Sequence, residues 1–237
     1  MKAILSVLFA LLAASASAAA RRPAVVELFT SQSCSSCPPA DALLGELAKR
    51  DDIVALGFHV TYWDGSAWRD PFARQASTER QIAYDKRLPG GQVYTPQMVI
   101  EGTEDAVGSD RSVVFAALDK AKPTAAAAVI FAADRRSVAI GAGMAPGGAS
   151  VLLARYTESR ATRVAGGENA SRTLTDTNGV VALATLGAWD GRAVSFPIDP
   201  PGDGEGLAVL VQAPDGRFLG AASTGAPATS LPQAPKA

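Results

Sequence analysis

The sequence predicts an α/β domain followed by a small all-β, sandwich-like domain, and three observations lead to this prediction. Apolar runs of strand length alternate with helical patterns over residues 25–121. The composition changes at Pro123, after which short apolar runs are separated by glycine-rich turns. The chain has 237 residues, enough for two domains. We therefore expect a first domain over 23–122 and a second over 125–222.

The first half of the α/β domain is predicted as strand, helix, strand. Residues 25–30 form a short apolar run, which is typical of a buried strand. Residues 38–50 place their apolar side chains on one helical face, and the two prolines that open this segment fit a helix only in its first turn. A second apolar run, over 53–60, predicts another strand with His59 at its end.

The rest of that domain is predicted as a helical insertion, a third strand and a last helix. The segment 62–91 is polar and mostly helical in pattern, and 97–101 is a short apolar run followed by a turn. Asp110 is placed to cap the last helix. The β-domain has five candidate strands, at 127–132, 137–142, 150–157, 193–198 and 206–212.

The two ends of the chain are predicted to lie outside both domains. Residues 1–18 have the order of a secretory signal peptide: Lys2, an apolar run over 4–12 and a small-residue triplet over 16–18. Residues 223–237 are rich in Pro, Ala and Ser, which is typical of a disordered tail. We expect a periplasmic or secreted protein with no membrane insertion after the signal peptide is removed.

The charge balance excludes a general attraction to polyanions. The chain has 22 basic and 23 acidic residues, a formal net charge of −1. We therefore expect no nucleic-acid partner. The composition does not indicate an oligomeric state.

The only cysteines of the chain, Cys34 and Cys37, form a C-x-x-C pair at the start of the first predicted helix. Free N–H groups and the positive end of the helix dipole favour a thiolate there, and the thiolate is the reactive form. We expect Cys34 at the very start of the helix, where the dipole acts most strongly, and Cys37 one turn further in, so Cys34 should be the solvent-facing thiol with the lower pKa. A disulfide across so short a loop stabilises a fold little, which favours a redox role over a structural one.

Two other classes of function remain open for this pair. A closed zinc site needs four ligands, and the chain has no second cysteine pair. Cu(I) prefers thiolates, so the pair could instead carry copper, with Met98 or His59 as a third ligand. The protein could also be a non-catalytic module that binds a partner through its β-domain. The exchange reaction itself requires no metal and no organic cofactor.

The order of these features resembles the thioredoxin-like superfamily over about residues 23–122. The segments VVELFTSQSCSSCPPAD, YWDGSAWRDPFA, YTPQMVIEG and GENASRTLTDTN are together similar to a secreted bacterial thioredoxin-like family of unknown function. The resemblance implies a mixed sheet with flanking helices and a cis bond between Thr95 and Pro96 beside the thiols. It also implies that Cys34 attacks and Cys37 resolves, and so an exported exchange protein that acts on protein or peptide thiols and disulfides.

Further site residues are predicted around the cysteines. Glu27, the one charge in the first strand, could relay protons to the thiols if it points toward them, or could be a strand-face carboxylate. Thr95 and Pro96 could receive an extended substrate peptide. Tyr62 and Trp63 could line a peptide groove or could pack the insertion onto the core. His59 is interpreted as an end-of-strand residue, and the glycosylation sequon at residues 169–171 as accidental.

Overall fold

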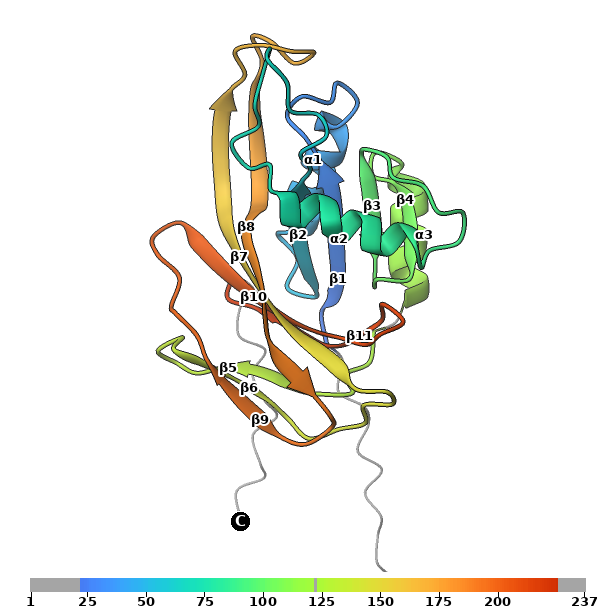
Figure 1. Ribbon diagram of the computed structural model, residues 1–237, viewed down its shortest axis with the longest axis vertical. Coiled ribbons are helices and arrows are strands. Elements are labelled where there is room, and N and C mark those ends of the chain that lie inside the picture. The colour runs from blue at the N-terminus through green and yellow to red at the C-terminus, as the bar shows by residue number, and fades with distance from the viewer. Residues whose placement is uncertain (1–21, 122, 226–237) are drawn as a thin grey trace, which may run out of the picture.

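The computed structural model describes residues 22–121 and 123–225, which form a mixed α/β fold with one large sheet, a smaller antiparallel sheet and three helices (Figure 1). The predicted signal peptide and most of the predicted tail lie outside these ranges. The last strand extends through Ser223, the first residue of that predicted tail. Within the described ranges, no helix is long and apolar enough to cross a membrane.

The first part of the chain follows the predicted order of elements. These are β1 (Ala24–Thr30), α1 (Pro38–Leu47), β2 (Ile53–His59), α2 (Gln75–Asp85), β3 (Gln97–Ile100), β4 (Glu104–Val107) and α3 (Arg111–Ala121). Two details differ from the prediction. The insertion is helical only in its second half, and the turn after the third strand leads into a further short strand, β4.

The second part of the chain consists of strands alone. They are β5 (Val129–Phe131), β6 (Ser137–Ile140), β7 (Ala149–Arg163), β8 (Thr173–Trp189), β9 (Val194–Pro197), β10 (Glu205–Gln212) and β11 (Phe218–Ser223). Neither β8 nor β11 was predicted from the sequence, and β7 was predicted at only about half of its 15 residues.

Strands from both parts of the chain share the large sheet, whose order is β11-β10-β7-β8-β2-β1-β3-β4. β1 runs parallel to β2 and antiparallel to β3, which in turn pairs antiparallel with β4. The two parts join where β8 meets β2, at a single parallel pair between Gly57 and Gly179. β5, β6 and β9 form the second sheet.

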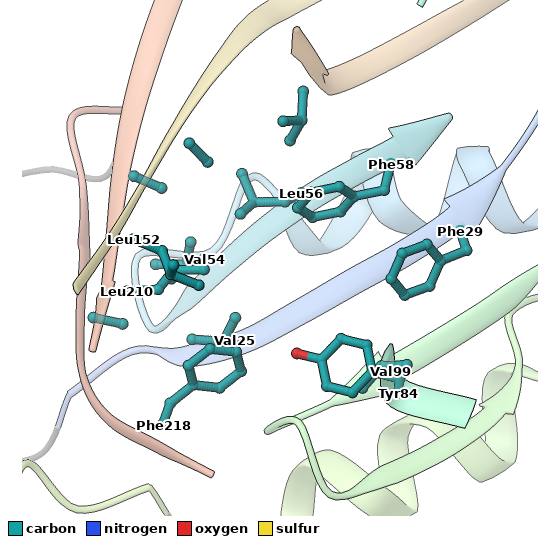
Figure 2. Close-up of a cluster of buried hydrophobic side chains, with 14 of the residues drawn as sticks. Val25, Phe29, Val54, Leu56, Phe58, Tyr84, Val99, Leu152, Leu210 and Phe218 are labelled. Atoms are coloured by element: carbon teal, nitrogen blue, oxygen red, sulfur yellow. The ribbon is translucent and has the colours of Figure 1, made fainter. Parts of the chain in front are cut away.

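Alternation along β1 sends its side chains to two different cores. Val26 and Leu28 face α1 and α3, whose apolar residues pack with them. Val25 and Phe29 face the opposite side, where the sheet curls so that β10 and β11 pack over β1 and β2 beside Tyr84 of α2 (Figure 2). The smaller sheet packs around Trp189 on the face of β7 and β10 that points away from β1 and β2.

The long hairpin of β7 and β8 reaches the end of the sheet where α1 begins. The two strands have 15 and 17 residues and rise side by side along the sheet (Figure 1). β8 lies against α1. The connection between these strands, residues 164–172, is called the hairpin tip below, and it contacts the loop that carries the cysteines.

Candidate functional site

Cys34 and Cys37 form a disulfide directly before α1, with Cys37 as the residue that precedes the first helical turn. Pro38 and Pro39 occupy that first turn, as predicted, because a missing N–H group costs little there. Cys34 is 1% exposed and Cys37 is 0% exposed. The expectation that Cys34 faces solvent is therefore wrong for the disulfide form, because the surrounding loops cover both cysteines.

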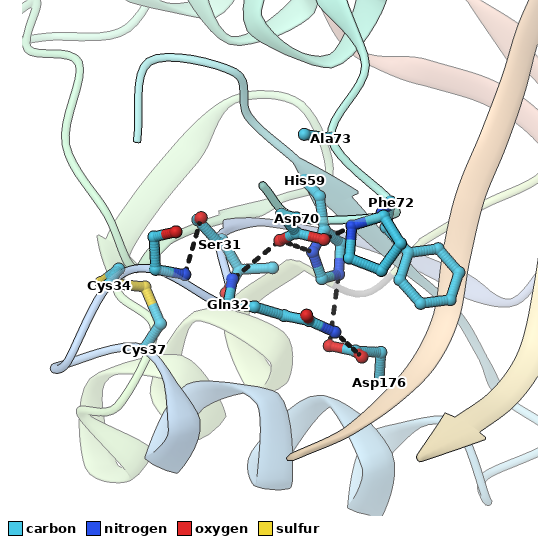
Figure 3. A network of polar contacts seen from close by, with 12 residues as sticks. Ser31, Gln32, Cys34, Cys37, His59, Asp70, Phe72, Ala73 and Asp176 are labelled. Atoms are coloured by element: carbon cyan, nitrogen blue, oxygen red, sulfur yellow. Dashed lines mark hydrogen bonds and ion pairs between the residues drawn. A yellow bond between two sulfur atoms is a disulfide. The ribbon is translucent and has the colours of Figure 1, made fainter. Parts of the chain in front are cut away.

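Gln32 anchors the loop that leads from β1 to the disulfide (Figure 3). Its backbone N–H donates to Asp70 Oδ2 at 2.7 Å, and its side-chain amide donates to Asp176 Oδ2 at 2.6 Å. Trp68 Nε1 donates to Gln32 Oε1 at 3.2 Å. The insertion and β8 therefore hold the same residue, two positions before Cys34, in place.

The hairpin tip holds the next part of this loop. The side-chain amide of Asn169 donates to the carbonyl oxygens of Gln32 and Cys34 at 3.0 and 2.9 Å. The carboxylate of Glu168 accepts from the backbone N–H of Ser35 at 3.0 Å. A segment more than 130 residues away in the chain thus completes the surroundings of the disulfide.

His59 lies buried among carboxylates next to Gln32 (Figure 3). Its Nδ1 lies 2.7 Å from Asp70 Oδ2 and its Nε2 lies 3.6 Å from Asp176 Oδ1. Burial works to lower the pKa of His59, but Asp70, Asp176 and Asp41 outweigh burial and raise that pKa to about 9. Burial in turn raises the pKa of Asp176, although the His59 cation opposes it. Both ring nitrogens face carboxylates, which counts against His59 as a copper ligand.

Asp41 is the acid on α1 that lies closest in sequence to the disulfide, four residues after Cys37. Thr30 Oγ1, at the end of β1, donates to Asp41 Oδ1 at 2.8 Å. Burial raises the pKa of Asp41 to about 7, with His59 and the Thr30 hydroxyl pulling in the other direction. This carboxyl group therefore exchanges its proton near neutral pH.

Glu27 lies on the face of β1 opposite the disulfide. It alternates with Val26 and Leu28, which pack against α1, so its own side chain points toward α2. There it is fully buried, paired with Arg80 and hydrogen-bonded by the Tyr84 hydroxyl. The structure does not bring Glu27 together with the cysteines. Glu27 is therefore not placed to relay protons to the thiols, and it is not a partly exposed carboxylate on the strand face either.

The other predicted residues gather at the start of β3. The bond between Thr95 and Pro96 is cis. Trp63 Nε1 donates to Thr95 Oγ1 at 2.7 Å, and the Tyr62 hydroxyl donates to Gln81 Oε1 at 3.1 Å. Tyr62 and Trp63 are 45% and 37% exposed, so both residues are accessible to a partner. Their contact with a substrate peptide, and that of Pro96 with the thiols, remain predictions.

Comparison with known proteins places the chain in a family. A family model described as a protein of unknown function, DUF1223, matches residues 25–212. The chain belongs to the DUF1223 family. A solved structure of a protein from Agrobacterium tumefaciens is 31% identical to it and superposes with a TM-score of 0.73, covering 91% of this chain and 99% of the other. The match to DUF1223 extends from β1 into β10, and thus covers both the disulfide and the hairpin that contacts it.

A second solved structure shares the fold alone. HBP35 of Porphyromonas gingivalis is 12% identical, with a TM-score of 0.61 over 92% of this chain and 80% of the other. The search of curated proteins found no match.

Sequence reasoning missed the polar residues around the disulfide: Gln32, Asp41, Asp70, Asn169 and Asp176. One indication was available, because Asn169 and Asp176 lie inside the segment GENASRTLTDTN, on which the family resemblance rests. The sequon there was interpreted as accidental. The Asn169 side chain is buried and bonded to the cysteine loop, so that residue has a structural reason to be asparagine.

Proposed function

We propose that this protein is an exported thiol–disulfide exchange protein whose Cys34–Cys37 pair cycles between disulfide and dithiol. The observation that carries the proposal is the placement of that disulfide at the N-terminus of α1, at one end of a mixed sheet. A disulfide persists in oxidising compartments, which agrees with the predicted signal peptide. We further propose that residues 23–122 are a thioredoxin-like domain, supported by the order β2-β1-β3-β4 with β1 and β2 parallel.

In the proposed reaction, the reduced protein transfers two electrons to a partner disulfide. The Cys34 thiolate attacks one partner sulfur, a mixed disulfide forms, and the other partner sulfur leaves as a thiolate. The Cys37 thiolate then attacks Cys34 Sγ, restores the intramolecular disulfide and releases the second partner thiolate. The two partner thiolates take up the protons that the two cysteines lost. The same steps in reverse oxidise a partner dithiol.

The structure favours Cys34 as the sulfur that meets the partner, since it precedes the two exposed serines of the loop. The Ser36 hydroxyl lies 3.3 Å from Cys34 Sγ and can donate to a thiolate there. Cys37 is fully buried and directly precedes the first turn of α1. A partner therefore gains access to Cys34 with a smaller rearrangement of the loop.

Catalytic turnover tests the proposal. We expect the purified mature protein to reduce insulin in the presence of dithiothreitol, and Cys34→Ser to abolish this activity. Cys37→Ser is expected to accumulate a mixed disulfide with the substrate, because the resolving thiol is missing. Cu(I) bound tightly at one ion per chain with no exchange activity would contradict the proposal and support the copper carrier.

Asp41 is expected to take the proton from Cys37 as that residue resolves the mixed disulfide. Its position four residues along α1 places it on the same helix face as Cys37, and its pKa of about 7 matches the task. Asp41→Asn should slow the resolving step roughly 100-fold at pH 7, at the lower end of general-base effects. The variant should also lose the pH dependence of this step near pH 7. The rate at which the mixed disulfide is released, measured at a series of pH values, tests this.

Glu46→Gln is the control for this variant. Glu46 lies on α1 as well, but it pairs with Arg111 at the surface. An Asp41→Asn profile that keeps the wild-type inflection near pH 7 would exclude Asp41 as the proton acceptor.

A further inference from the structure

Hydrogen bonds within the hairpin tip hold its shape, and a close main-chain contact holds it against the insertion. Within it, the backbone N–H groups of Val164 and Ser171 donate to Arg172 and Val164. A Cβ atom at Gly166 would lie 1.9 Å from the carbonyl oxygen of Ala67, so the two main chains are in direct contact there. Residues of the tip can therefore hold a neighbouring loop in a defined position.

Asn169 uses both of its amide hydrogens on the disulfide loop. It is fully buried, its amide nitrogen donates to the carbonyls of Gln32 and Cys34, and its Oδ1 accepts from the Arg172 guanidinium at 2.6 Å. Nδ2 has two hydrogens to give, and both are given to main-chain oxygens on either side of Ser33. The bond from a cation polarises the amide and strengthens both donations.

We propose that Asn169 is a positioning residue that stabilises the disulfide state of the Cys34–Cys37 pair relative to the dithiol state. The inference rests on the proposed exchange function and extends it to the second half of the chain. Asn169 hydrogen-bonds to the carbonyl oxygen of Cys34 and not to its sulfur, and so acts through the loop. In the dithiol form the sulfur atoms must separate to van der Waals contact, so the loop moves and the geometry of these two hydrogen bonds is lost or weakened.

A purely structural role predicts a different result. If Asn169 only held the hairpin tip to the rest of the fold, its loss would destabilise the oxidised and reduced proteins equally. The equilibrium between the two would then be unchanged, because the stability of each form and the redox equilibrium belong to one thermodynamic cycle. Measuring the redox equilibrium of the cysteine pair therefore distinguishes a positioning role of Asn169 from a purely structural role.

The test equilibrates the full mature protein with reduced and oxidised glutathione. Two glutathione thiols give two electrons and two protons to the protein disulfide and leave as glutathione disulfide. We expect Asn169→Ala to lower the equilibrium constant for the disulfide form about tenfold, from the loss of two neutral hydrogen bonds, which corresponds to about 30 mV for a two-electron couple. Chemical unfolding should show a larger loss of stability for the oxidised form than for the reduced one.

Two further variants keep the test decisive. Arg172→Gln removes only the cation on Asn169 Oδ1 and should shift the equilibrium in the same direction by a smaller factor; it decides the question if Asn169→Ala does not fold. Asn178→Ala is the control: its amide also donates to a main-chain oxygen, that of Ala55, but not on the cysteine loop. It should lower the stability of both forms and leave the glutathione equilibrium unchanged.

Two outcomes overturn the inference: an Asn169→Ala equilibrium constant within twofold of wild type, or an equal shift in Asn178→Ala. The wild-type insulin assay is a separate measurement. A wild-type protein that fails to turn over insulin while Asn169→Ala still shifts the glutathione equilibrium would refute the proposed function and leave the positioning role standing.

Discussion

Replacing Arg80 by methionine is expected to lower the free energy of unfolding by about 3–5 kcal/mol, the usual cost of leaving a buried charge without its partner. Arg80 Nε and Nη2 donate to the two oxygens of Glu27 at 2.8 and 3.0 Å. The Glu27 side chain is 0% exposed. Arg80 also donates to Gln212 of β10, so the pair joins α2, β1 and the second half of the chain.

Urea unfolding of the oxidised protein measures this loss. The double variant Arg80→Met with Glu27→Gln should recover a large part of it, because no buried charge then remains. Arg111→Met is the matched control: its partner, Glu46, is exposed, and we expect a cost of no more than about 1 kcal/mol. Equal costs for Arg80→Met and Arg111→Met would show that the buried pair has no special role.

The elements of the first part of the chain follow from local patterns. The apolar runs of β1 and β2 are buried along their whole length, and α1 carries its apolar residues on one face, so periodicity was a sufficient guide. The position of the cysteine pair before a helix followed from the two prolines after it, whereas the sequence left open whether the pair is a dithiol, a disulfide or a metal site. These predictions needed no knowledge of which segments meet in space.

β8 was missed because its sequence resembles a turn. It contains Asn178-Gly179, a dipeptide typical of tight turns, yet both residues lie inside a strand of 17 residues. Asn178 has a φ of 48°, and its neighbour Gly179 forms the single pair with β2. The left-handed residue therefore lies inside the strand, directly before the pair that joins the two halves of the sheet. Tertiary contact, which no local pattern reports, decides between turn and strand here.

The sequence predicted the cysteine pair of the candidate site but not the polar residues around it, again because tertiary contacts decide them. Alternation shows that Glu27 and Thr30 point to opposite faces of β1, but it does not show which face α1 covers. The acid near the disulfide is therefore Asp41, bonded to Thr30, and not Glu27. Asp70 comes from the insertion, Asn169 from the hairpin tip and Asp176 from β8, and no local pattern shows that these segments meet the cysteine loop.

Replacing His59 by glutamine is expected to change how the stability of the protein depends on pH. His59 is the only histidine of the chain, and its pKa is raised from 6.5 to about 9 by the surrounding carboxylates. A group whose pKa is higher in the folded state stabilises the fold fully below its unfolded pKa and loses that effect as pH rises through its folded pKa. The shift corresponds to about 3 kcal/mol, fully present below pH 6.5 and lost by about pH 9.

Wild type and His59→Gln should therefore differ most near pH 6 and converge as pH approaches 9, apart from a constant difference in packing. Unfolding of the oxidised protein in urea at a series of pH values measures this, and the disulfide removes the two thiols from the titration. The pKa of Asp41 is raised to about 7 and is lowered by His59, so replacing His59 also moves the titration of Asp41 to higher pH. The comparison is therefore repeated in an Asp41→Asn background, which removes that contribution. A wild-type-to-variant difference that stays constant between pH 6 and pH 9 would show that the folded protein does not raise the pKa of His59. The carboxylates of Asp70 and Asp176, 2.7 and 3.6 Å from its ring nitrogens, would then not stabilise the imidazolium.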